Sequence, residues 1–193
     1  MKTLISNFNY RVCVDTSPLM EKQWAMKSGI GWIGKHTNLI TRDYGSWLFL
    51  GEILIDQEIE PDSIYSEDLC GTCTECIDQC PTDAIVEPYV LDSNKCISYL
   101  TIEHRGDLPD DKKDSLDNWL YGCDICQEVC PWNIKFESKT KNLNFYPRDE
   151  IKKRKSIKDW EITKDEFSQI FKKSAVKRTK YEGLKRNIEL VKE

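Results

Sequence analysis

The 193-residue chain has 28 Lys and Arg against 33 Asp and Glu, which gives a formal net charge of −5 at pH 7. Hydrophobic residues make up 39% of the sequence and charged residues 32%, as in a polar globular protein of one or two domains. No apolar run approaches the ~20 residues that a membrane helix requires, and the short apolar stretch after Met1 is not typical of a secretory signal. We therefore expect a cytoplasmic protein that does not cross a membrane.

Patterns of regular structure begin with residues 8–14, whose partial alternation predicts a strand. Ser17 is suited to an N-cap and Pro18 to the first helical position, so we expect a helix from there to residue 28, with Gly29 as its stop. Residues 38–41 and 46–55 are predicted strands. The second is apolar on both faces, which predicts a central, buried strand.

Residues 29–37 match G-x-G-x-x-G and nearly match a phosphate-binding loop. Both motifs need a strand before the glycines and a helix after them. Here a helix is expected before and a strand after, and His36 stands where the phosphate loop needs Ser or Thr. We therefore interpret the segment as a glycine-rich backbone that can approach a flat or bulky ligand closely. Whether His36 contacts a cofactor or packs a turn stays open.

Further along the chain, we expect a short helical turn from Pro81 and a helix over residues 97–104. Thr163 and Glu166 form a capping box that starts another helix with an apolar stripe. A last, basic helix over about residues 177–191 carries Arg178, Lys180, Lys185 and Arg186.

The charge is unevenly distributed along the chain. Residues 151–193 hold 14 Lys and Arg against 7 Asp and Glu, whereas residues 1–150 hold 14 against 26. A basic segment can bind nucleic-acid phosphates, but a solvated helix face has the same composition. Charge alone leaves both interpretations open.

The strongest motif is a run of four cysteines, C-x2-C-x2-C-x3-C-P, which begins at Cys70 and ends at Cys80-Pro81. This spacing is typical of bacterial ferredoxins, in which the fourth cysteine binds the other of two 4Fe–4S clusters. A second cysteine set is therefore needed to bind the other cluster, and the sequence contains one with a matching end, Cys130-Pro131. The predicted ligand sets are Cys70, Cys73, Cys76 with Cys130, and Cys80 with Cys96, Cys123, Cys126.

The alternatives are structural zinc and disulfides. Zinc ribbons use two well-separated C-x2-C pairs, which the closely spaced run from Cys70 does not resemble. The odd count of nine cysteines and the absence of a secretory signal favour a reducing compartment over disulfides. The ninth, Cys13, lies in a predicted strand and is expected to be a small buried hydrophobe. Trp132, which follows Cys130-Pro131, is expected to shield a cluster from water, and His104 is expected to be a surface residue.

Several long motifs around the cysteines resemble epoxyqueuosine reductases. They are Val14-Asp-Thr-x-Pro18, Gly29-Ile-Gly-Trp-Ile-Gly-Lys35, Gly45-Ser-Trp-Leu-Phe-Leu-Gly-Glu52, Cys96-Ile-Ser-Tyr-Leu-Thr-Ile-Glu103 and Tyr121-Gly-Cys-Asp-x-Cys-x-x-Val-Cys-Pro-Trp-Asn133. The resemblance implies a cytoplasmic enzyme that uses cobalamin and two 4Fe–4S clusters. It implies removal of the epoxide oxygen from epoxyqueuosine at the wobble position of tRNA, the last step of queuosine synthesis.

The fold that the resemblance implies is of the α+β class. Residues 1–62 would be the C-terminal part of a cobalamin-binding α/β domain, and residues 63–140 a ferredoxin-like domain with both clusters. Residues 141–193 would form a basic helical segment. Family members begin with a first half of the cobalamin domain that this sequence lacks, and they often continue into a helical-repeat tail.

The resemblance also implies site residues. Asp15 would donate the proton and touch cobalamin, although an Asp just before a helix start is also an ordinary cap, and the helix dipole there favours the anion. The other cobalamin contacts implied by the matched motifs are Gly31, Lys35, Asn38, Leu39, Ser98 and Thr101. The partners implied are the tRNA anticodon loop and an external electron donor, for a monomeric enzyme. Two other hypotheses are a 4Fe–4S electron carrier and a tRNA-binding fragment without catalysis.

Overall fold

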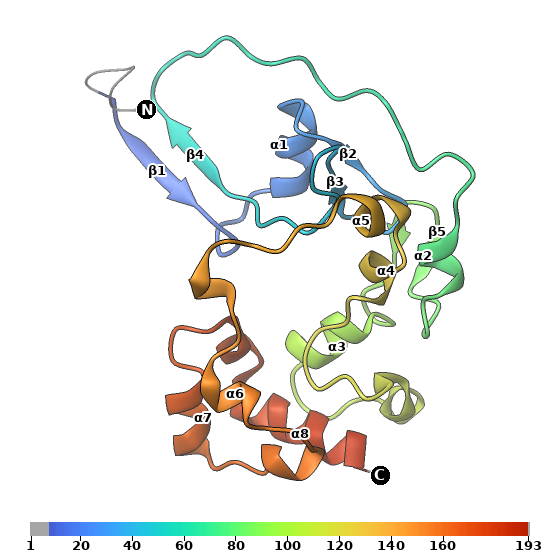
Figure 1. Ribbon diagram of the computed structural model, residues 1–193, viewed down its shortest axis with the longest axis vertical. Coiled ribbons are helices and arrows are strands. Elements are labelled where there is room, and N and C mark those ends of the chain that lie inside the picture. The colour runs from blue at the N-terminus through green and yellow to red at the C-terminus, as the bar shows by residue number, and fades with distance from the viewer. Residues whose placement is uncertain (1–7, 193) are drawn as a thin grey trace.

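The computed structural model describes residues 8–192 (Figure 1). The strands are β1 Tyr10–Cys13, β2 Trp32–Ile33, β3 Leu39–Ile40, β4 Glu52–Ile55, β5 Ile85–Glu87 and β6 Val90–Leu91. The α-helices are α1 Glu21–Lys27, α2 Glu75–Asp78, α3 Ile97–Ile102, α4 Ile125–Glu128, α5 Pro131–Phe136, α6 Asp149–Lys152, α7 Lys164–Ile170 and α8 Lys180–Lys192. Four 3-10 turns join them: η1 Asp110–Leu116, η2 Leu143–Phe145, η3 Ile157–Trp160 and η4 Ala175–Thr179.

The strands pair as three separate two-stranded antiparallel sheets, β1 with β4, β2 with β3, and β5 with β6. The prediction of a central strand over residues 46–55 is wrong, because only Glu52–Ile55 is extended and β1 is its single partner in the described residues. Phe49 is 86% exposed and Ile53 is 52% exposed. An apolar sequence identifies a strand as buried only when other elements cover both of its faces.

The first helix begins later than the sequence indicates. α1 begins at Glu21 with Met20 at the N-cap position, and Ser17 makes no cap. Gly29 does end the helix: its φ is +72°, and the next residue, Ile30, donates a backbone hydrogen bond to Ala25 O over 3.0 Å. This left-handed stop is the one expected of glycine.

The glycine-rich segment forms the β2–β3 hairpin after α1, so the rejection of both phosphate-binding motifs is confirmed. Gly31 is required by packing, because a Cβ there would lie 2.0 Å from Ile40 O. A Cβ at Gly34 would lie 2.5 Å from the Ile40 side chain. These glycines allow the two strands of the hairpin to approach each other closely.

The two cysteine loops have related structures. α2 follows Thr74 in the first loop and α4 follows Asp124 in the second, and the two short helices contact each other. The helix predicted from Pro81 is wrong, because the chain turns there and continues into the β5–β6 hairpin. After the second loop, by contrast, Pro131 occupies the first turn of α5.

The C-terminal residues form a helical cluster in the lower part of Figure 1. The capping box of Thr163 and Glu166 at the start of α7 is confirmed, with both hydrogen bonds present. The apolar core of this cluster consists of four buried residues: Phe167, Phe171, Leu184 and Ile188. The predicted basic helix is split, because Arg178 lies in η4 and α8 begins only at Lys180.

A second small core connects the hairpin to the cysteine loops. Trp32 and Ile40 pack against Cys130, with Leu69 and Trp132 at the periphery. The predicted domain boundary at residues 62 and 63 therefore separates segments that share one core.

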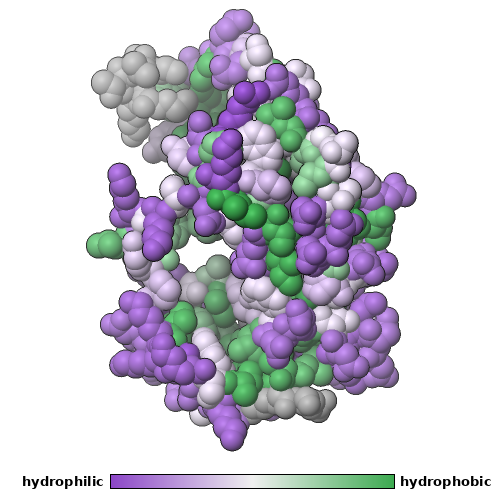
Figure 2. All heavy atoms as spheres, turned by 45° about the vertical axis from the view of Figure 1, so that its right-hand side comes forward, coloured by the Kyte–Doolittle hydropathy of each residue, from purple (hydrophilic) through white to green (hydrophobic). Residues whose placement is uncertain are grey.

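None of the described helices is long and apolar enough to cross a lipid bilayer. Hydrophilic side chains cover much of the face shown in Figure 2, and apolar atoms reach the surface in patches.

Helix α8 is tied to the cysteine region by Asn187, which is completely buried. Its Nδ2 donates to Thr101 O and to Leu120 O, both over 2.9 Å. The neighbouring Arg186 donates to Leu100 O over 2.8 Å and to Gly106 O over 2.7 Å. The C-terminal helix thus holds two parts of the chain that precede the second cysteine loop, the end of α3 and the segment just before Cys123.

We expect Asn187→Leu to lower the free energy of unfolding by about 3 kcal/mol, because it removes both hydrogen bonds of a buried amide. Leu120 O then loses this donor, and Thr101 O keeps the hydroxyl of Thr179. Urea titration of the iron-loaded protein measures this change. Asn144→Leu, at an exposed position in η2, is the matched control and should change stability by less than about 0.5 kcal/mol. Equal losses in the two variants would contradict the structural role of Asn187.

Candidate metal centre

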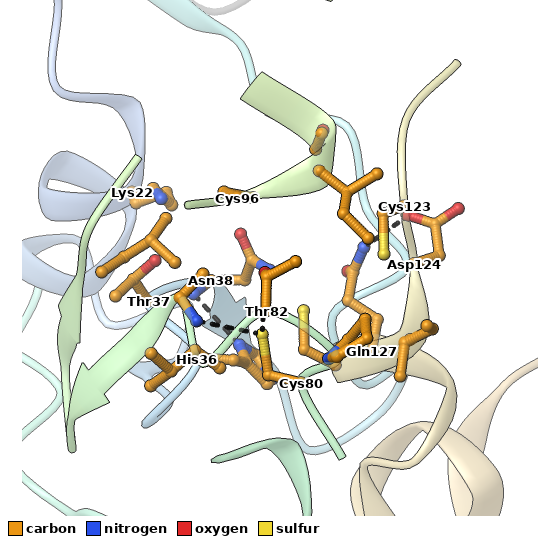
Figure 3. A pocket seen from close by; sticks show the side chains of 18 residues that line it. Lys22, His36, Thr37, Asn38, Cys80, Thr82, Cys96, Cys123, Asp124 and Gln127 are labelled. Atoms are coloured by element: carbon orange, nitrogen blue, oxygen red, sulfur yellow. Dashed lines mark hydrogen bonds between the residues drawn. The ribbon is translucent and has the colours of Figure 1, made fainter. Parts of the chain in front are cut away.

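The eight predicted cysteine ligands line two cavities. The first, of about 140 Å³, is lined by Cys70, Cys73, Cys76 and Cys130. The second, of about 230 Å³, is lined by Cys80, Cys96, Cys123 and Cys126, which Figure 3 shows with their neighbours. The structure thus brings together the two sets predicted from spacing, including the exchange of Cys80 and Cys130 between the loops.

The electrostatics within each set favour a bound cation. Burial and then the charges of Cys70, Cys130 and Cys73 raise the pKa of Cys76 to about 11. Burial and then the charges of Cys123, Cys96, Cys76 and Cys80 raise the pKa of Cys126 to about 12. Four thiolates at such short range repel one another. The positive charge of a coordinated metal centre offsets this repulsion and keeps its thiol ligands deprotonated.

The described residues contain no group of three or more Cys, His, Asp or Glu side chains placed to hold one metal ion. A zinc site would need four sulfurs about 2.3 Å from one ion. Cysteines around a cavity, too far apart for a single ion, suit a multi-iron cluster instead. The geometry therefore favours 4Fe–4S clusters over structural zinc.

Lys35 supports the first cysteine loop. Its Nζ donates to Gly71 O over 2.7 Å and to Cys73 O over 2.8 Å, and the side chain is only 9% exposed. The loop is therefore held from the β2–β3 hairpin by a buried cation. These two hydrogen bonds give Lys35 a role at the cluster loop, and its expected contact with cobalamin stays a prediction.

One tryptophan lines the first cavity, and a second packs against it and against Cys130. Trp132 lines the cavity and donates from Nε1 to Leu69 O over 3.3 Å. Trp32 is 2% exposed, and its Nε1 has no hydrogen-bond partner in the described residues. Burial raises the pKa of the Cys70 thiol, and Lys35 and Trp32 partly offset the rise. The expected shielding role of Trp132 agrees with this position.

Asp15 lies just after β1, and its φ of +55° is in the left-handed region. Its side chain is exposed, and it is close enough to Tyr121 and Arg178 to influence the pKa of both. Tyr121 lies two residues before the second cysteine loop, and Asp15 itself lines neither cysteine cavity. With α1 beginning only at Glu21, the expected effect of the helix dipole on Asp15 is absent.

The other residues expected to contact cobalamin are dispersed. Asn38 and Ser98 line the second cavity. Leu39 is 4% exposed, and Gly31 is explained by hairpin packing. Thr101 is fully buried, with its hydroxyl donating to Ile97 O and accepting from the Gly122 N–H, so its side chain has no surface for a cofactor.

Two residues outside the predicted site also help to build it. Asn133 is fully buried; its Nδ2 donates to Gln127 O and Ser46 Oγ, both over 2.8 Å, which fixes α5 behind Cys130. Trp32 forms part of the first cavity's surroundings. Both stand inside the motifs quoted above, but only the folded chain shows which groups they contact.

Comparison with known proteins supports this interpretation of the cysteines. Residues 69–133 match the family described as "4Fe-4S double cluster binding domain". The fold and the site thus define an iron–sulfur protein of the double-cluster class.

Individual similar proteins indicate a more specific class. An epoxyqueuosine reductase of Leadbetterella byssophila is 53% identical over 184 residues, which cover 95% of this chain and 59% of the relative. A crystal structure of epoxyqueuosine reductase with an epoxyqueuosine-modified tRNA-Tyr stem loop matches with a TM-score of 0.87 and 35% identity, over 95% of this chain and 48% of that one. The Bacillus subtilis enzyme, solved with its catalytic Asp loop swung out of the active site, matches with a TM-score of 0.87 and 33% identity, over 98% of this chain and 50% of that one.

The chain is thus similar to epoxyqueuosine reductases over nearly its whole length. It spans about three fifths of the length of the curated relatives it matches.

Proposed function

We propose that these residues form the iron–sulfur part and one edge of the active site of an enzyme that reduces epoxyqueuosine to queuosine in tRNA. The observation that carries the proposal is the pair of adjoining four-cysteine cavities in a chain 53% identical to an epoxyqueuosine reductase. Removal of the epoxide oxygen as water consumes two electrons and two protons. The residues of such an enzyme must therefore hold redox cofactors, donate a proton and bind the RNA.

The clusters and cobalamin, when bound, supply the electrons, which must come from an external donor. The eight cysteines hold the clusters, and Trp32 and Trp132 exclude water from one of them. Asn38 and Ser98, at the second cavity, are the described residues best placed to meet cobalamin. Asp15 holds the proton that the departing oxygen needs.

For the RNA, we propose phosphate contacts from the basic C-terminal segment. The candidates are exposed lysines in and around η4: Lys172, Lys173, Lys177 and Lys180. Arg186 serves the fold instead, through its carbonyl contacts, and Arg178 pairs with Glu103. The relative solved with a tRNA stem loop supports tRNA as the partner. The reduced cysteines favour a cytoplasmic enzyme, and we propose that it acts as a monomer.

The test is conversion of epoxyqueuosine in an anticodon stem loop. Iron-loaded protein is incubated with cobalamin, a chemical reductant and the modified RNA, and the nucleosides are quantified by mass spectrometry. We expect loss of one oxygen and formation of queuosine. Intact epoxyqueuosine after incubation with protein that carries both clusters and cobalamin would refute the activity.

A second candidate function, electron transfer between proteins, is favoured by one observation. Residues 8–192 form both cluster cavities, but the residues expected to contact cobalamin do not gather around one cavity. Titration of the iron-loaded protein with cobalamin distinguishes the two candidates. Stoichiometric uptake supports the reductase, and no uptake supports the carrier.

A further inference from the structure

His36 lies between the two cysteine sets. It follows Lys35 in the β2–β3 hairpin, is 3% exposed and lines both cavities. Figure 3 shows its ring among the side chains around the cavity of Cys80. A histidine in the shared wall of two metal sites, but outside both ligand sets, requires an explanation.

The hydrogen bonds of the ring identify which nitrogen carries the proton. Nδ1 accepts the Asn38 backbone N–H over 3.1 Å, so the proton of the neutral ring is on Nε2. Nε2 is buried and has no hydrogen-bond partner in the part of the chain that the structure describes. An unpaired buried N–H costs about 1–3 kcal/mol, and buried donors in folded proteins almost always have an acceptor.

The surroundings hold the ring in place. A Cβ at Gly34 would lie 3.2 Å from His36 Cε1 and closer still to Ile40, so the hairpin leaves just the space that the ring fills. The ring is therefore a fixed donor, and its acceptor must be a group that enters the cavities.

We propose that the Nε2–H of His36 donates a hydrogen bond to a sulfur atom of one of the two 4Fe–4S clusters, and so raises that cluster's reduction potential. Hydrogen bonds to the sulfurs are one of the determinants of cluster potential, because they stabilise the more negative, reduced state. His36 is thus a positioning and tuning residue at the boundary between the clusters. The inference rests on the cluster sites and is independent of the reaction on tRNA.

The chain offers a matched control, because it contains only two histidines. His104 lines neither cavity, and its Nε2 forms a hydrogen bond with Asp107 O over 2.9 Å. In anaerobic redox titrations followed by EPR, His36→Leu should lower one midpoint potential by the equivalent of about a tenfold change in the reduction equilibrium, about 59 mV for one electron. His36→Gln keeps an N–H near the position of Nε2 and should restore much of the shift, and His104→Leu should change neither potential.

A direct measurement covers the case in which His36→Leu fails to assemble its clusters. In wild-type protein labelled with 15N-histidine, pulsed EPR of the reduced clusters should detect a 15N coupling that persists in His104→Leu. Absence of this coupling would overturn the proposal. Unchanged potentials in a fully iron-loaded His36→Leu protein, which would mean that the acceptor is only water, would overturn it as well.

Discussion

Asp15→Asn should lower the rate of queuosine formation by about a hundredfold to ten-thousandfold, the usual contribution of a positioned general acid. The amide has nearly the same shape as the carboxylic acid but has no proton to give to the departing oxygen. The rate is measured under single-turnover conditions with iron-loaded, cobalamin-bound protein and epoxyqueuosine-modified stem loop. Both clusters should remain, so iron content and the EPR spectrum should not change.

The backbone makes Asn the informative replacement. Asp15 has a φ of +55°, and Asn tolerates this left-handed conformation at least as well as Asp. The variant therefore removes the acid without straining the loop.

Asp117→Asn is the matched control. Asp117 is also exposed and has a φ of +44°, at the end of η1. The Asp117→Asn variant should retain full turnover. Unchanged turnover in Asp15→Asn would refute the acid assignment, and equal losses in both variants would show a general effect of the substitution.

Local rules explain which parts of the fold the sequence predicts well. The three cysteines Cys70, Cys73 and Cys76 line one cavity because they lie close together on one short loop, and the α7 capping box involves residues three positions apart, Thr163 and Glu166. Gly29 ends α1 for an equally local reason, its left-handed φ. In each case, the groups that determine the structure are neighbours in the chain.

The parts that sequence patterns miss depend on distant partners. The apolar run before Ile55 indicates burial, but Phe49 is 86% exposed, because its stacking contact with Phe145 of η2 covers little of the ring. Lys35 reaches carbonyls of the first cysteine loop, 36 and 38 residues further along the chain. Thr101 is enclosed by Thr179 and Asn187 from the C-terminal helices. Motif resemblance marks such positions as important, and only the folded chain shows what each side chain contacts.

The exchange of cysteines between the two loops predicts a distinctive set of variants. Cys73→Ala and Cys130→Ala should remove the same cluster, although the residues lie in different loops, because both line the first cavity. Cys80→Ala and Cys96→Ala should remove the other cluster. In each variant, iron should fall from about eight to about four per chain, since each 4Fe–4S cluster is lost as a unit.

The EPR spectrum of the cluster that remains in each variant identifies the pairing. If each loop instead held its own cluster, Cys130→Ala would have the spectrum of Cys96→Ala, and Cys80→Ala that of Cys73→Ala. Cys13→Ala is the control: Cys13 is buried in β1, apart from both cavities, and this variant should keep about eight irons. The exchange matters for function because each loop then contributes ligands to both clusters. The contact between α2 and α4 therefore holds the two clusters in one rigid unit, through which electrons can pass.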